Sequence, residues 1–167
     1  MHYSAVANVS SPEIRMPKPE QLKQIARECP GFQARSTARA ITRFFNAYFR
    51  SLDVTSEQFS LLIGIEAAKG ITVAELAAES GVDTTTLSRN VQVLEKRELV
   101  RGVGRGRAGK QLELTLTGRS LLEKAVPLWR RARTELAAVL GESRLMSANR
   151  AMRSVADAAR FREIARS

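Results

Sequence analysis

The spacing of apolar residues predicts that most of this chain is helical. In segment 35–52, apolar residues recur at intervals of three and four, which is the period of one face of an α-helix. These residues are Ile41, Phe45, Tyr48 and Leu52. Three arginines spaced four apart occupy a different face: Arg35, Arg39 and Arg43. The segment is therefore expected to form a long amphipathic helix, aromatic on one side and basic on another.

Two further helices are predicted from their capping residues. Thr55 followed by Gln58 forms a capping box, and Gly70 is expected to end the helix that it begins. Thr72 followed by Glu75 repeats the pattern before a shorter helix. The inward positions predicted for the first of these helices are Phe59, Leu62, Ile63 and Ala67, and for the second Val73, Leu76 and Ala77.

A helix-turn-helix motif follows from the next stop and start signals. Gly81 ends the short helix after Ser80, and Asp83 begins a fourth helix only two residues later, which is predicted to run from Thr84 to about Glu98. Its apolar stripe is Leu87, Val91 and Leu94. The opposite face carries hydroxyl, amide and cationic groups, which bind phosphates and base edges: Thr85, Ser88, Arg89, Gln92 and Lys96.

A basic hairpin is predicted directly after this helix. Segments 99–103 and 111–115 have the composition of short strands, and the glycine-rich segment 104–110 connects them. From Arg101 to Lys110 the chain has four cations and no anion: Arg101, Arg105, Arg107 and Lys110. A basic hairpin placed after a recognition helix is the wing of a winged helix.

Long helices are predicted on the C-terminal side. Thr117 is expected to begin a helix that runs to about Gly141 with a kink at Pro127, and a last helix covers 147–164. The apolar stripes of these helices are too long for a 167-residue monomer to bury easily, which favours a partner copy. In the last helix the stripe includes Met152, Val155, Ala159 and Phe161. Segment 1–30 holds four of the five prolines, with a short helix expected at 19–29. The first residues are either a disordered tail or an arm on a partner subunit.

Composition narrows the function. Lys and Arg total 27 against 17 Asp and Glu, giving a net charge of +10 that attracts a polyanion. A single cysteine (Cys29) and a single histidine (His2) exclude an internal disulfide and a thiolate metal cage, and they argue against nucleophilic catalysis. We expect no cofactor and no metal. No apolar run is long enough to span a membrane. The N-terminus lacks the basic start and apolar middle of a secretion signal, so a cytoplasmic location is expected.

The order of these elements resembles the MarR family of bacterial transcription regulators, over about residues 32–140. The segments that carry the resemblance are 60–62, 73–77, 82–90, 94–97, 99–100 and 114–115 with 118–119. Segments 29–32 (CPGF) and 127–129 (PLW) look like one subgroup of that family. Two departures alter the expected DNA contacts. The wing has Ala108-Gly109-Lys110 where an Asp-Arg-Arg tip is usual, and Thr84 stands where a long side chain is common.

The resemblance implies a mainly α fold with a small β wing, in which a winged helix-turn-helix lobe (53–118) sits on a helical dimerisation stalk (31–52 and 119–167). It implies a homodimer that binds a pseudo-palindromic operator in double-stranded DNA, commonly as a repressor, and no membrane partner. The expected DNA contacts are Thr84, Thr85, Thr86, Ser88, Arg89, Gln92, Lys96, Arg101, Arg105, Arg107 and Lys110.

Regulation stays open between several alternatives. Family members often bind a small aromatic or phenolic anion between stalk and lobe, and such an effector would meet Arg39, Arg43, Phe45, Tyr48, Phe59 and Trp129, which could instead be plain core. Cys29 could serve as a single-cysteine redox sensor. A non-specific DNA-coating protein is a further alternative, which the net charge supports and the ordered polar face 85–92 opposes.

Overall fold

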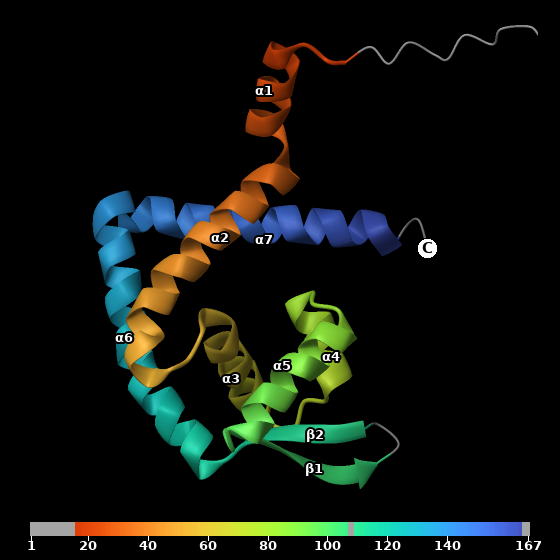
Figure 1. Ribbon diagram of the computed structural model, residues 1–167, viewed down its shortest axis with the longest axis vertical. Coiled ribbons are helices and arrows are strands. Elements are labelled where there is room, and N and C mark those ends of the chain that lie inside the picture. Colours follow the sequence, from red (N-terminus) through yellow and green to blue (C-terminus); the bar gives the residue numbers. More distant parts are fainter. Residues whose placement is uncertain (1–15, 107–108, 165–167) are drawn as a thin grey trace, which may run out of the picture. The chain divides into compact units, whose positions relative to one another are not determined.

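The structure, a computed structural model, describes residues 16–106 and 109–164 (Figure 1). Part of the predicted N-terminal extension (1–15) and the predicted contact Arg107 lie outside the described residues, and of Arg105 the backbone alone is described. The chain divides into two compact units, one ending at Ala40 and the other beginning at Ile41.

The first unit contains helix α1 and the first half of helix α2. Helix α1 spans Pro19–Glu28, as the sequence predicts, and α2 spans Pro30–Phe49. The prediction that this second helix begins near Arg35 is wrong. Pro30 suits a first helical position because its missing N–H leaves no unpaired donor there. The carbonyl of Cys29 then accepts the backbone N–H groups of Phe32 and Gln33, both at 3.1 Å. Cys29 itself is half-buried at this junction.

The second unit contains the remainder of α2 and all other elements. These are η1 (Arg50–Leu52), α3 (Ser56–Ala68), α4 (Val73–Ser80), α5 (Thr84–Lys96), β1 (Val100–Gly106), β2 (Gly109–Leu114), α6 (Leu116–Leu140) and α7 (Glu142–Ile164). The two strands form an antiparallel hairpin in which Val100 pairs with Leu114 and Gly102 with Leu112. The backbone N–H of Leu112 also donates to the carbonyl of Ile71 (2.8 Å), so the segment before α4 borders the sheet.

The predicted helix caps of α3 and α4 are confirmed. Thr55 and Gln58, and likewise Thr72 and Glu75, form reciprocal capping boxes. Gly81 ends α4 with a left-handed φ of 67°. The end of α3 differs slightly from the prediction, because Lys69 takes the left-handed cap position one residue before Gly70.

The inner face of α3 was only partly predicted. Phe59 and Leu62 are buried, but Ile63 and Ala67 are exposed, and Leu61 and Ile65 are buried instead. The reason is that α3 contacts α5, α6 and β2, so it buries several sides rather than one stripe.

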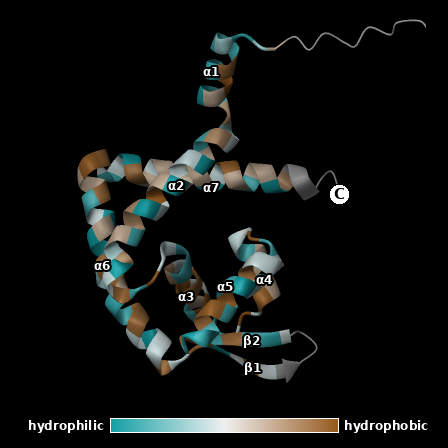
Figure 2. Cartoon of the chain, viewed as in Figure 1, coloured by the Kyte–Doolittle hydropathy of each residue, from teal (hydrophilic) through white to brown (hydrophobic). Residues whose placement is uncertain are grey.

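Two apolar clusters form the core of the second unit. The larger lies between α3, α4, α5 and the sheet, and Figure 2 shows apolar residues concentrated there. Its fully buried side chains include Leu62, Ile65, Leu87, Leu94 and Leu112. The smaller cluster joins the end of α2 to α3 and α6 and contains Phe49, Val54, Phe59 and Ala125. Helix α5 packs on the larger cluster through Leu87, Val91 and Leu94, and the opposite face of the helix points outward.

The start of α6 contacts the segment that leads into β1. The prediction that Thr117 begins this helix is wrong. Thr115 is the N-cap, because its hydroxyl accepts from the N–H of Gly118 (3.0 Å) and donates to the carbonyl of Glu98. A Cβ at Gly118 would stand 2.0 Å from the carbonyl oxygen of Leu99, so only glycine permits this approach. Helix α6 continues past Pro127 to Leu140.

Helix α7 begins at Glu142, five residues before the predicted start. The carboxylate of Glu142 accepts hydrogen bonds from the guanidinium of Arg133 on α6, which ties the two helices at their junction. Met152, Val155 and Phe161 of the predicted apolar stripe are exposed in the single chain. Among the described helices, none has both the length and the apolar composition to cross a membrane.

Candidate nucleic-acid interface and cavity

The start of helix α5 is set by Asp83. Its carboxylate accepts the backbone N–H of Thr86 at 2.9 Å, as expected of an N-cap. Hydrogen bonds from the hydroxyl and the backbone N–H of Thr86 hold the pKa of Asp83 below its ordinary value of 3.8. The carboxylate is therefore charged at neutral pH and complements the positive end of the helix dipole. Because its backbone N–H bonds to Asp83, Thr86 belongs to the cap as well as to the outer surface.

The two faces of α5 differ as the periodicity predicts. Leu87, Val91 and Leu94 are buried in the larger core cluster. On the other side, most of the predicted contact residues are exposed: Thr84, Thr85, Thr86, Arg89, Gln92 and Lys96. Ser88 is half-buried. From Thr85 to Gln92 the helix carries no acidic residue. This face can donate and accept hydrogen bonds and can neutralise phosphate.

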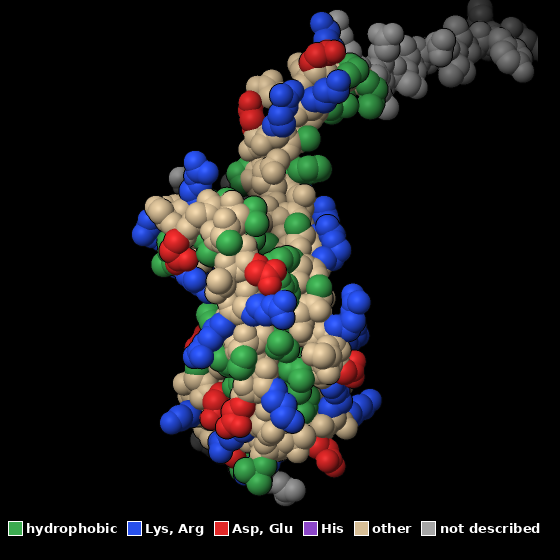
Figure 3. Space-filling model, turned by 90° about the vertical axis from the view of Figure 1, so that its left-hand side faces the viewer, with side chains coloured by type: hydrophobic (Ala, Val, Ile, Leu, Met, Phe, Trp, Pro, Cys, Tyr) green, Lys and Arg blue, Asp and Glu red, His purple; other side chains and the backbone are tan. Residues whose placement is uncertain are grey.

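The described cations of the wing are both ion-paired. Arg101 contacts Glu113, its directly opposite partner in the hairpin, at 3.2 Å. Lys110 contacts Glu95 of α5 at 3.1 Å. Sequence reasoning missed both carboxylate partners, because no local pattern links residues 12 or 15 apart. Figure 3 shows basic and acidic side chains interspersed on the face that carries α6.

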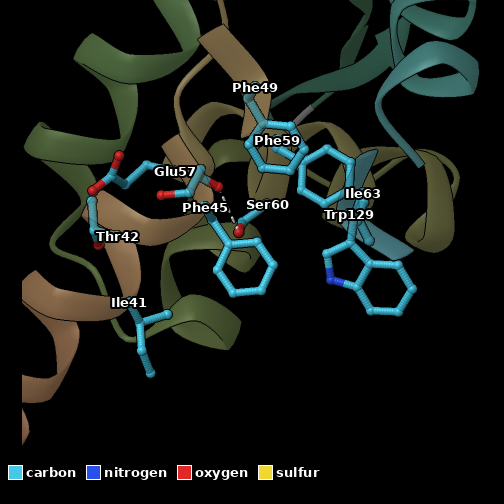
Figure 4. A pocket seen from close by; sticks show the side chains of 10 residues that line it. Ile41, Thr42, Phe45, Phe49, Glu57, Phe59, Ser60, Ile63 and Trp129 are labelled. Carbon is cyan, nitrogen blue, oxygen red and sulfur yellow. Dashed lines mark hydrogen bonds between the residues drawn. The ribbon is translucent and has the colours of Figure 1, made fainter. Parts of the chain in front are cut away.

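A cavity of about 360 Å³ lies at the junction of α2, α3 and α6 (Figure 4). Aromatic rings dominate its wall: Phe45, Phe49, Phe59 and Trp129. Phe49 and Phe59 are in contact, with ring centroids 4.6 Å apart. The other lining residues are Ile41, Thr42, Ser56, Glu57, Ser60 and Ile63. Among these described lining residues, Glu57 carries the only charge.

The structure brings together part of the predicted effector set. Phe45, Phe59 and Trp129 line the cavity, whereas Arg43 and Tyr48 are not among its lining residues. Arg39 belongs to the first unit. Sequence reasoning missed Phe49 and Glu57. The four-residue spacing from Phe45 was a signal for Phe49.

Tyr48 has a different partner, the carboxylate of Glu135 on α6. Its hydroxyl donates to that carboxylate, which raises the pKa of Tyr48 and lowers that of Glu135. Arg131 donates to the same carboxylate (3.2 Å). This network joins the end of α2 to α6. No group of three or more His, Cys, Asp or Glu that could hold a metal is found in the described part of the chain.

Comparison with known proteins identifies the family. A model described as MarR family matches residues 52–111. The crystal structure of the M. tuberculosis transcriptional regulator MosR in complex with DNA is 36% identical, with a TM-score of 0.68. The match covers 80% of this chain and 99% of that one. The chain belongs to the MarR family.

Two more distant structures share the fold of this MarR-family chain. A mutant of MarR from E. coli complexed with operator DNA is 24% identical, with a TM-score of 0.70 and coverage of 78% of this chain and 96% of that one. The MepR–DNA complex from S. aureus is 17% identical, with a TM-score of 0.66 and coverage of 80% and 98%. The mainly helical fold with a two-stranded wing is thus confirmed. No curated protein matches the chain.

Proposed function

We propose that this MarR-family protein is a sequence-specific DNA-binding transcriptional regulator and not an enzyme. The observation that carries the proposal is the outward face of α5, a capped helix that presents hydroxyl, amide and guanidinium groups and no carboxylate between Thr85 and Gln92. The 36% identity to MosR, whose structure contains DNA, supports it. Non-specific coating needs only charge, so it does not account for this ordered face.

The proposed contacts divide into two groups. Residues of α5 meet base edges or adjacent phosphates in the major groove: Thr84, Thr85, Thr86, Ser88, Arg89 and Gln92. Cations further along meet phosphate or the minor groove: Lys96, Arg101, Arg105, Arg107 and Lys110. The lobe at 53–118 would bind DNA, and 31–52 with 119–167 would dimerise.

We propose a homodimer that acts as a repressor on a pseudo-palindromic operator. The exposed apolar residues of α7, including Val155 and Phe161, support a partner copy, because such residues gain stability when they leave water. Two-fold symmetry would place the two half-sites about 10 base pairs apart. The CPGF segment at 29–32 and the PLW segment at 127–129 support assignment to one MarR subgroup.

The experiment that tests this function is selection of bound duplexes from a random pool. Recovery of a palindrome with that spacing supports the proposal. Enrichment of no sequence, together with easy displacement by competitor DNA, would favour the coating alternative.

Arg89→Ala should then weaken binding to the recovered operator by about 1–3 kcal/mol and relax base preference at one position. Arg130→Ala is the matched control, because it removes the same charge from an exposed position of α6. Equal effects of the two substitutions in a gel-shift titration would remove Arg89 from the base contacts.

The cavity supports a small aromatic effector. Its four aromatic rings suit a flat apolar ligand, and the carboxylate of Glu57 disfavours an anion at its wall. We therefore propose a neutral or cationic aromatic effector rather than the phenolic anion common in the family. Thermal-shift measurements with neutral, cationic and anionic aromatic compounds test this class. Stabilisation by the anions alone would contradict it, and Glu57→Gln is expected to remove the preference for cations.

A further inference from the structure

Lys110 lies on the inner face of the wing. Side chains alternate between the two faces of a strand, so Lys110 shares a face with the buried residues Leu112 and Leu114. Arg101 and Glu113 lie on the opposite face and pair with each other. Lys110 is therefore the described wing cation that is turned toward the helices.

The missing side chain of Gly102 makes room for Lys110. A Cβ at residue 102 would stand 1.9 Å from Cε of Lys110 and 2.3 Å from its Cδ. Gly102 is not among the glycines with positive φ, so its backbone conformation does not require glycine. The lysine stem occupies the space that a side chain at this position would fill, so any larger residue would displace the stem from its present path.

Beyond Gly102 the ammonium group reaches helix α5. It lies 3.1 Å from Oε1 of Glu95, whose side chain is 30% exposed. Glu95 follows the fully buried Leu94 and stands one residue before the proposed contact Lys96. The contact thus connects the last turn of the recognition helix to the second strand of the wing.

We propose that Gly102 and Glu95 are positioning residues for DNA binding, which hold Lys110 as a strut between the wing and α5. The proposal rests on the proposed function. An exposed ion pair adds little to folding stability, so the effect of the strut is expected in the position at which Lys110 is held for DNA and not in the stability of the lobe. An ammonium has three donors, and those not bonded to Glu95 remain for phosphate. The Arg101–Glu113 pair stays within the hairpin and cannot couple it to α5.

The first test is a double-mutant cycle of Gly102→Ala and Lys110→Ala, measured by titration of the selected operator and of an unrelated duplex. Gly102→Ala displaces the stem and keeps every charge. We expect about a three- to tenfold loss of operator affinity with little change for the unrelated duplex. In the Lys110→Ala background the added methyl group has no stem to displace and should cost nothing further. Unchanged operator affinity, or the same loss in both backgrounds, overturns the strut.

The second test uses the sign of the charge change. Glu95→Ala and Glu113→Ala each remove one carboxylate that pairs with a wing cation. Charge alone predicts that both tighten binding to every duplex. The strut predicts that Glu95→Ala lowers the ratio of operator to unrelated affinity and that Glu113→Ala leaves this ratio unchanged. Equal ratios in the two variants overturn the proposal. A wild-type chain that selects no duplex overturns the proposed function itself, a result distinguishable from loss of the strut alone.

Discussion

The winged lobe and helix α7 differ in how far they bury their apolar side chains. The lobe closes its own core, since residues from α3, α4, α5 and both strands bury one another. Helix α7 has 23 residues, and among those whose side chains are described Leu145 is the one that is buried. Its residues Val155 and Phe161 are 53% and 70% exposed. The lobe is therefore stabilised by its own contacts, whereas α7 leaves apolar side chains exposed within the described part of the chain, which supports the proposed partner copy.

The largest effect is expected from a cavity in the lobe. Leu94 is fully buried, and Leu94→Ala should lower the free energy of unfolding by about 2–5 kcal/mol, since contacts are lost and the core cannot close the gap. Denaturant unfolding measures this. The control is Val155→Ala on α7, which should have a small effect on a dilute sample. If both substitutions cost the same, the contrast between the two regions is incorrect.

The next effect concerns association. Val155→Asp places a charge in the exposed apolar stripe of α7, and we expect it to weaken dimerisation by about 2–4 kcal/mol because the carboxylate would lose its hydration on association. Sedimentation over a range of concentrations measures the dissociation constant. The lobe should keep its fold, as judged by thermal unfolding of the monomer. A variant that remains as dimeric as wild type would show that this stripe is not the interface.

What could be predicted from the sequence follows the same division. The caps of α3, α4 and α5 were predictable because Thr55, Thr72 and Asp83 each bond to a backbone N–H three residues away. Thr115 and Thr117 look alike locally, and the choice between them depends on distant contacts of Thr115 and Gly118 with Glu98 and Leu99.

In the candidate site, too, the features set by local periodicity were predictable and the contacts between separate elements were not. The outward face of α5 followed from helical periodicity, because a one-sided helix buries one stripe. The Lys110–Glu95 pair and the place of Glu57 in the cavity wall depend on how separate elements pack. No pattern within a few residues encodes such contacts. Tyr48 is an example in which the local pattern misled, because its helical spacing placed it with the cavity residues, whereas its hydroxyl bonds to Glu135.

A smaller effect is expected from the capping box of α4. Thr72→Ala removes the side-chain acceptor for the N–H of Glu75 and should lower lobe stability by about 0.5–2 kcal/mol in thermal or denaturant unfolding. The carboxylate of Glu75 in this capping box also makes the stability of the lobe depend on pH. Hydrogen bonds from the backbone and hydroxyl of Thr72 lower the pKa of Glu75 below its ordinary 4.5 in the folded state. Its contribution is therefore present at neutral pH and is lost as the pH falls through the lowered folded-state pKa. Glu75→Gln should flatten this acid dependence, and an unchanged pH profile would contradict the assignment.

The smallest effect separates the two regions by their response to salt. Lys96 is exposed at the end of α5, and Arg153 is exposed on α7, so Lys96→Ala and Arg153→Ala each remove one positive charge. A cation that contacts phosphate releases counterions, and its loss should reduce the slope of log affinity against log salt by about one unit. We expect this reduction for Lys96→Ala and a nearly unchanged slope for Arg153→Ala, in titrations with one duplex over a series of salt concentrations. Equal slopes in the two variants would mean that net charge, rather than the lobe surface, determines the response, because only a localised interface makes the position of a charge matter.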